Sequence, residues 1–344
     1  MKIKLLFFFC VSFMTASAQT GGTHAFPFLD LVYNARSAGL GGDFITGYGK
    51  DLNMGIENPA LLNERMNKAI SINEALLSGG IHYGMFNYGF NLNDYGTVSS
   101  YIKYVHYGKF ERTNINGTSA GTFSPFEMIA GAGFGRQLNP RISVGGNANI
   151  LYSQLESYSA LGASIDIAGA FKDEDKGYII TALAKNVGMQ FKSHTSGNRA
   201  SLPVEFQLAG AYKLPHAPFR FTLLAHHLNN WDITYNDPDL QPTLDPLTGD
   251  SIPVQRPGFF GKLSRHFSYQ LEVLVSKNIH LRTGFDFHRR REMALEQRPG
   301  AAGLSFGLGL YFKKFSLDYG FMMYSQSGFN NMLTISSNVS NWRK

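Results

Sequence analysis

Two adjacent histidines, His226 and His227, are the side chains of this 344-residue sequence that most directly suggest chemistry. Imidazole nitrogens bind transition metals and transfer protons near neutral pH. The pair lies at the end of residues 218–229, where apolar and polar residues alternate as in a β-strand. Adjacent side chains of a regular strand point to opposite faces, so the two are predicted not to share one metal ion. We interpret them as interior or loop-base histidines, and no metal site is predicted.

The segment 230–264 combines several aspartates with prolines and is the longest stretch without strand-like alternation after residue 67. Carboxylates are ligands for Ca²⁺, but the spacing does not follow an EF-hand, so a solvated loop and a calcium site stay open as alternatives. Loops longer than about fifteen residues are uncommon unless they are functional or disordered. We expect this one to dock a partner that covers its two phenylalanines. The acidic residues and the phenylalanines are Asp232, Asp237, Asp239, Asp245, Asp250, Phe259 and Phe260.

A basic run follows at His288, Arg289, Arg290 and Arg291. Guanidinium groups pair well with phosphate, so contact with the phosphates of a membrane surface is one interpretation. A solvated charge run is the favoured one. The formal charge of +6 is spread along the chain, and no nucleic-acid partner is predicted.

Motifs for catalysis are not found in the sequence. It has no Gly-x-Ser-x-Gly elbow, no phosphate-binding Gly-x-x-x-x-Gly-Lys and no His-Glu-x-x-His. Gly131, Gly133 and Gly135 lie within a strand-like segment with no helix after them, so we expect them to admit a close neighbour rather than a dinucleotide. We predict no enzyme activity, no catalytic residue and no cofactor.

Residues 1–18 have the pattern of a secretory signal peptide. Lys2 and Lys4 precede the mostly apolar residues 5–14, and Ala16-Ser17-Ala18 provides small residues for cleavage before Gln19. The single cysteine, Cys10, lies inside this leader, so the exported chain is predicted to hold no thiol.

From residue 67 onward the sequence alternates with a period of two. In residues 279–288 the odd positions are mostly apolar, whereas the even positions include His280, Arg282 and Asp286. Most of these segments have ten to fifteen residues, which suits tilted membrane-crossing strands better than the shorter strands of soluble proteins. Fourteen segments are predicted, at 67–76, 80–91, 96–108, 123–137, 141–152, 157–171, 177–187, 203–214, 218–229, 265–276, 279–288, 301–312, 314–324 and 330–340.

The connections between these segments differ in length on the two sides. Those after even-numbered segments are short, whereas several after odd-numbered ones are long, as in transmembrane β-barrels. The predicted fold is therefore all-β: a 14-stranded antiparallel transmembrane barrel over residues 67–344, with short turns in the periplasm and long loops outside. A soluble β-sandwich is the weaker alternative, because it would have to hide a large apolar outer surface.

Residues 19–66 do not alternate and are predicted to fold back as a hatch that plugs the lumen. Buried there, Arg36 would need a carboxylate or carbonyl partner. Asn58 can cap a short helix that begins at Pro59. The residues singled out in this hatch are Arg36, Gly39, Gly41, Gly42, Asn58, Pro59 and Ala60.

The pair "ARSAGLGG … NPALL" in residues 35–62 resembles the opening of the FadL-like outer-membrane barrels. Within that group the chain is most similar to the PorQ/PorV family of the Bacteroidetes type IX secretion system, and residues 26–44 are most like PorQ. The resemblance implies a non-enzymatic barrel that anchors PorZ-like, PorU-like and PorV-like partners at the cell surface, beside outer-membrane lipid and lipopolysaccharide.

The alternative function is a FadL-like channel for hydrophobic small molecules. Such a channel needs an apolar pocket beside the lumen. The expected inward faces carry Asp166, Glu272, Arg282 and Asp286, so we predict a polar interior that disfavours this alternative.

Overall fold

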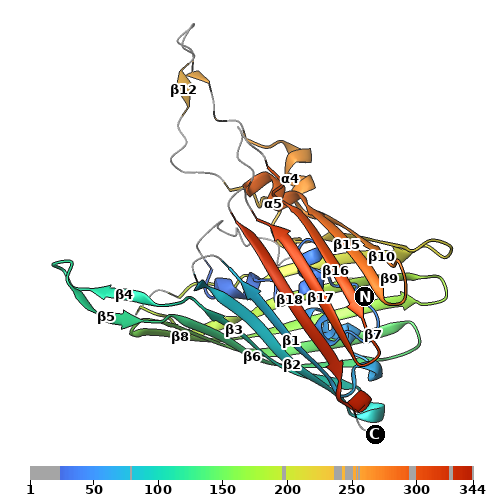
Figure 1. The fold of residues 1–344 in the computed structure, drawn as a ribbon. Coiled ribbons are helices and arrows are strands. Elements are labelled where there is room, and N and C mark those ends of the chain that lie inside the picture. The colour runs from blue at the N-terminus through green and yellow to red at the C-terminus, as the bar shows by residue number, and fades with distance from the viewer. Residues whose placement is uncertain are drawn as a thin grey trace, which may run out of the picture.

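The computed structural model describes residues 24–77, 80–195, 199–235, 242–244, 251–252, 254, 256–293, 300–324 and 328–342. Within them, fourteen strands form a closed antiparallel barrel (Figure 1), which confirms the predicted fold class. Each predicted segment overlaps one strand. The strands are β1 Ala69–Leu76, β2 His82–Asn91, β3 Thr97–His106, β6 Phe126–Gln137, β7 Ile142–Leu155, β8 Tyr158–Asp173, β9 Tyr178–Lys192, β10 Glu205–Lys213, β11 Phe219–Ala225, β14 Phe267–Val273, β15 Ile279–Asp286, β16 Leu304–Tyr311, β17 Phe315–Met323 and β18 Phe329–Asn338.

The barrel closes where β1 pairs with β18, with Ile72 opposite Ile335. At one end, here called the short-turn end, the strands are joined by connections such as 138–141 and 312–314. The other is called the long-loop end because it carries the connections 107–125, 193–204, 226–266 and 287–303. Two small hairpins lie within these connections, β4 Phe110–Thr113 with β5 Ser119–Phe123, and β12 Thr243–Leu244 with β13 Ser251–Ile252.

Two helices at the long-loop end were not predicted. They are α4, Phe259–Arg265, and α5, Phe287–Met293 (Figure 1). The sequence pattern continued the strand to His288 and placed the arginine run in a loop, which is wrong. The carboxylate of Asp286 accepts a hydrogen bond from the backbone N–H of Arg289 at 2.7 Å, and such a cap ends the strand and starts a helix.

The two faces of the wall have opposite character. Outward side chains are apolar and exposed in the isolated chain, for example Ile72 (56%) and Ile150 (61%), while inward neighbours such as Asn73 and Asn149 are buried. This arrangement is the reverse of a soluble protein and is typical of barrels that face lipid. No helix of the described residues is long and apolar enough to cross a membrane.

The interior holds residues 24–66, here called the N-terminal segment. It consists of α2 Ala35–Gly39, α3 Leu52–Glu57 and the short 3-10 helices η1 Pro27–Asp30, η2 Pro59–Leu61 and η3 Glu64–Met66, drawn in blue in Figure 1. Its residues form two buried apolar clusters with inward residues of the wall. These contacts support a plug, but the predicted limits of the leader and hatch stay predictions, and residues 1–23 lie outside the described part of the chain.

Close backbone contact between α2 and the wall depends on glycine. A Cβ atom on Gly39 would lie 2.7 Å from the Cα of Gly307 in β16. Gly41 has φ of 100°, a left-handed conformation that suits glycine. On the opposite wall, a Cβ on Gly135 would lie 2.4 Å from the carbonyl oxygen of Pro59, so this glycine admits the N-terminal segment, as predicted.

Candidate functional site

A buried ionic network joins the N-terminal segment to the wall. Arg36, on α2, donates from Nε and Nη2 to the two carboxylate oxygens of Glu272 in β14, each at 3.0 Å. Glu272 is only 1% exposed. Arg36 Nη1 also lies 3.3 Å from Asp51, which precedes α3. Arg36 therefore has the carboxylate partner that its burial requires.

The wall completes this network with two further arginines. Arg220 donates to Glu272 at 2.8 Å, and Arg282 Nε donates to the same carboxylate at 3.3 Å. Arg282 Nη1 lies 2.6 Å from Asp318. Three guanidinium groups thus face three carboxylates, and this balance makes their burial tolerable. The surrounding negative charge raises the pKa of Arg36 above its usual value, against the lowering effect of burial.

Neutral hydrogen bonds hold the rest of the segment. The side-chain oxygen of Asn58 accepts from the backbone N–H of Ala60 at 3.0 Å and so caps η2, which begins at Pro59. Asn58 Nδ2 also donates to the carbonyl of Ile45. Farther along, Asn53 Oδ1 accepts hydrogen bonds from Ser71, Asn73 and Asn87 of the wall. The segment is therefore tied to the barrel at several independent points.

Much of the inward wall is apolar, so the prediction of a polar interior is wrong in part. Near the long-loop end, Phe26, Phe28 and Val32 of the N-terminal segment pack in one buried cluster with wall residues. A second cluster joins Leu40 and Phe44 to the β8–β11 side. Of the polar positions that the sequence singled out, Glu272 and Arg282 lie beside Arg36 and Asp286 lies at the rim, whereas Asp166 accepts hydrogen bonds from Asn147 and Asn149 on β7. The wall residues of the two clusters include Tyr83, Val105, Ile129, Leu151, Met322 and Met332, and Ala168, Ile179, Leu183, Ala209 and Leu224.

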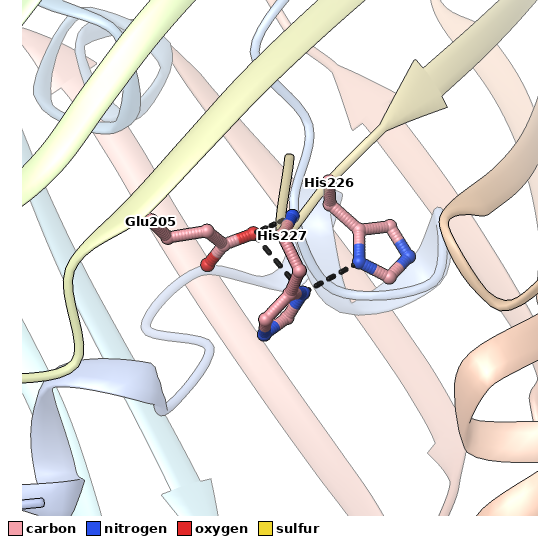
Figure 2. Close-up of side chains that lie close together, drawn as sticks. All are labelled: Glu205, His226 and His227. Atoms are coloured by element: carbon pink, nitrogen blue, oxygen red, sulfur yellow. Dashed lines mark hydrogen bonds and ion pairs between the residues drawn. The ribbon is translucent and has the colours of Figure 1, made fainter. Parts of the chain in front are cut away.

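The two adjacent histidines meet at the long-loop end. His226 Nδ1 lies 2.7 Å from His227 Nδ1, and Glu205 Oε1, at the start of β10, lies 3.4 Å from His227 Nδ1 (Figure 2). The expectation that the two rings point apart is wrong because β11 ends at Ala225 and His227 adopts a left-handed φ of 55°. Strand alternation therefore does not extend to this pair.

Burial governs the protonation of this histidine group. Removal from water lowers the pKa of His226, and nearby Asp286 opposes this only partly. Burial also lowers the pKa of His227, against the opposing charge of Glu205. His288, at the start of α5, has its ring 5.7 Å from that of His227, and burial lowers its pKa as well. Burial therefore favours the neutral form of these three imidazoles.

A bulge in β9 places the ammonium group of Lys185 beside Glu205 and the histidines. Pairing between β8 and β9 shifts between Ile165 and Ile167, and Asn186 has φ of 60°. The extra residue turns both Lys185 and Asn186 inward. Lys185 Nζ then lies 3.2 Å from Glu205 and 3.0 Å from Asp43 of the N-terminal segment. Sequence analysis did not identify Glu205, Lys185 or Asp43, because no motif or spacing links them.

Comparisons with known proteins address the fold. No protein-family model and no curated protein matches the chain. Among solved structures, the chain is similar to the Pseudomonas putida toluene transporter TodX, with a TM-score of 0.53, 12% identity, and coverage of 90% of this chain and 98% of TodX. The Ralstonia pickettii toluene transporter TbuX gives a TM-score of 0.51, 9% identity and coverage of 90% and 99%.

The chain shares the fold of these transporters. A TodX mutant described as a monoaromatic hydrocarbon channel gives a TM-score of 0.55, 12% identity, and coverage of 89% of this chain and 99% of the mutant. The barrel implied by the resemblance of residues 35–62 is therefore confirmed as a fold. The comparisons do not support the type IX secretion assignment, which stays a proposal.

Only some of the predicted docking residues lie in the described part of the chain. Phe259 and Phe260, on α4, are 61% and 81% exposed, and the Trp231 ring lies 5.2 Å from that of Phe259. Asp232 Oδ2 lies 2.5 Å from Nζ of Lys262, which is on α4 as well. The four other aspartates, Asp237, Asp239, Asp245 and Asp250, fall outside the described residues, so the calcium and docking interpretations of that loop are not tested.

The arginine run is not a uniform solvated surface. Arg289 donates to the carbonyl of Gly41 at 2.9 Å and lies over the Tyr324 ring at 4.9 Å, so it holds the N-terminal segment. Gly42 faces this guanidinium group, because a Cβ there would lie 3.2 Å from Arg289 Nη2. Arg290 donates to the carbonyl of Gly300 at 2.6 Å, and Arg291 is exposed. For Arg289 the solvated interpretation is therefore wrong.

Proposed function

We propose that the protein is an outer-membrane channel for small hydrophobic compounds, closed by its N-terminal segment. The observation that carries the proposal is the apolar inward wall near the long-loop end, which Phe26 and Phe28 cover. The toluene transporters with the same fold add support, since toluene is an apolar compound.

The energetics favour movement of one part of the segment. Burying a phenylalanine side chain stabilises by about 1.5–3 kcal/mol, and an apolar solute that takes its place replaces much of that contact. Breaking the buried pair of Arg36 and Glu272 costs about 3–5 kcal/mol, and no apolar solute offsets that cost. Residues 24–33 are therefore expected to move first, while α2 stays on the wall.

Uptake by intact cells tests the proposal. The full chain is produced in a Gram-negative host that lacks its own channel for hydrophobic compounds, and entry of radiolabelled toluene is measured against a host carrying an unrelated barrel. We expect toluene to enter several-fold faster, with no change for a sugar of similar size. Equal toluene entry in the two hosts, with the protein folded in the outer membrane, would refute the channel.

The second candidate is the anchoring of type IX secretion partners at the cell surface. It is supported by the resemblance of residues 26–62 and by the exposed aromatic side chains of Trp231, Phe259 and Phe260 at the long-loop end. Affinity capture from native membranes tests it. The wild-type chain is expected to retain PorZ-like or PorU-like partners that W231A/F259A/F260A loses. Capture of neither partner by the wild-type chain would count against this function.

A further inference from the structure

Glu205, His226 and His227 present three donor atoms that lie within 4.8 Å of one another. Two are imidazole nitrogens and one is a carboxylate oxygen, a donor set found in zinc sites. We propose that these three residues bind one Zn²⁺ ion at the long-loop end of the barrel, with water as the fourth ligand. This site does not depend on the proposed transport function.

The distances are close to those of a tetrahedral ion. Zinc bonds of about 2.0–2.2 Å place neighbouring ligand atoms roughly 3.3 Å apart. Glu205 Oε1 and His227 Nδ1 are 3.4 Å apart, while the two Nδ1 atoms are 2.7 Å apart. A ring rotation that separates the two imidazole nitrogens by about 0.6 Å brings them to this spacing, and all three ligand atoms already lie within 4.8 Å of one another. Ca²⁺ and Mg²⁺ fit less well, because they select oxygen ligands throughout.

Neighbouring groups orient two of the ligands, Glu205 and His226. Gln207 Nε2 donates to Glu205 Oε1 at 2.8 Å. The backbone N–H of His226 donates to the carbonyl of His266 at 2.9 Å, which fixes the chain beside the site. Metal-binding histidines usually direct their second nitrogen at a carboxylate or carbonyl. His226 Nε2 is buried without a hydrogen-bond partner and points toward Asp286, 3.6 Å away, as this arrangement requires.

The charges around the site favour a divalent cation. Asp43, Glu205 and Asp286 bring three carboxylates to this region, and Lys185 provides one ammonium group against them. Carboxylates close to the ligand atoms favour the binding of a cation. The side chain of His227 is 41% exposed, so an ion can reach the site from the barrel rim.

Bound zinc would join two parts of the rim. Glu205 follows the connection 193–204, and the histidines begin the connection 226–266. Because the ligands flank two of the longest connections, the ion is expected to stabilise the folded state of the chain that binds it.

Calorimetry on the full chain in detergent tests the site. The purified protein is treated with EDTA, exchanged into buffer at pH 7.5 and titrated with ZnCl₂, beside H226Q/H227Q and E205Q. His82 and His106 give a matched control, because their rings lie 5.4 Å apart at the same end of the barrel. We expect one site in the wild-type chain and in H82Q/H106Q, and at least about 100-fold weaker binding in the other two variants.

Cobalt provides a second measurement on the wild-type chain, which does not rely on variants that fold. Co²⁺ bound in place of Zn²⁺ is expected to give the intense visible absorption of a tetrahedral site, and Zn²⁺ is expected to displace it. The proposal is overturned if the wild-type chain binds no Zn²⁺, if H226Q/H227Q binds it as tightly as the wild-type chain, or if H82Q/H106Q loses binding.

Discussion

At the scale of single residues, Glu272 is the shared partner of the buried ionic network. Its two oxygens accept hydrogen bonds from Arg36, Arg220 and Arg282, and its burial would be unfavourable without them. The free-energy cost of losing one member of such a network exceeds that of an exposed ion pair, because the remaining charges stay buried.

Substitution E272Q is therefore expected to destabilise the folded barrel by about 3–5 kcal/mol. Glutamine keeps the shape but leaves three arginines with one carboxylate fewer. Unfolding of the purified protein in detergent, followed by circular dichroism in increasing denaturant, measures the change. E174Q is the control, because Glu174 lies 3.7 Å from Arg65 with both side chains about half exposed, and a loss below about 1 kcal/mol is expected there. Equal losses would contradict the central role of Glu272.

Glu57, the last residue of α3, makes the stability of the folded state depend on pH. Burial raises the pKa of its carboxyl group above the usual value, while nearby Lys103 opposes the shift. The folded state then holds the proton more tightly than the unfolded chain. The stability that protonated Glu57 contributes is fully present below the ordinary carboxyl pKa and is lost as the pH rises through the raised pKa.

E57Q is expected to remove this loss. Glutamine keeps an oxygen that can accept the hydrogen bond from Asn34 Nδ2, now 3.1 Å from Glu57 Oε1. Unfolding temperatures of variant and wild type should coincide near pH 4 and diverge in favour of E57Q toward pH 8. A difference that shrinks as the pH rises would show that the assigned direction is wrong.

At the scale of elements, the N-terminal segment has two parts with different attachments. Residues 24–33 are held mainly by apolar contacts and by the hydrogen bond from the Ala25 N–H to the Ser201 carbonyl at 2.8 Å. The part around α2 and α3 is held by the ionic network and by polar contacts, such as that between Thr46 and Thr222 hydroxyls at 3.4 Å. The first part is the one expected to open.

Cross-linking distinguishes the two parts. His24 Nδ1 lies 3.3 Å from Ser201 Oγ, so H24C/S201C accepts a short, reducible thiol cross-linker. Closing that link should abolish toluene uptake, and reduction should restore it. The matched link T46C/T222C should leave uptake near the wild-type rate, because this part stays on the wall. Uptake that survives the first link, or fails only with the second, would place the moving part elsewhere.

At the scale of the whole molecule, closure of the sheet explains why apolar side chains face outward while many polar side chains face the interior. β1 and β18 pair along their length, so no backbone edge is left open to lipid. The exposed outer side chains then require an apolar surrounding, and the interior needs its own filling from the N-terminal segment.

Substitution I150K tests this orientation. Ile150 lies outward on β7, and a lysine at such a position near the bilayer midplane costs about 2–4 kcal/mol. The variant is expected to fold less stably in lipid vesicles, as measured by urea unfolding. T118K, in the exposed turn of the β4–β5 hairpin, should behave as the wild type. A stable I150K barrel would show that this face does not meet lipid.

The sequence by itself determined the strands, their faces and the need for a buried partner at Arg36. Those features are local: side chains alternate along any strand, and a buried charge needs a counter-charge wherever it lies. Most strand ends were therefore close. The largest errors fell where a cap at Asp286 or the left-handed His227 broke the alternation, and at β9, which continues to Lys192 beyond the bulge at Asn186.

Only the tertiary structure decided which residues meet inside the barrel. Glu272 reaches Arg36 across 236 positions of the chain, and Glu205 reaches His227 across 22, because closure brings distant strands around the N-terminal segment. No periodicity encodes such pairings. The apolar lining was missed for the same reason: an inward alanine or leucine becomes part of a buried cluster only when the residues that pack against it are known.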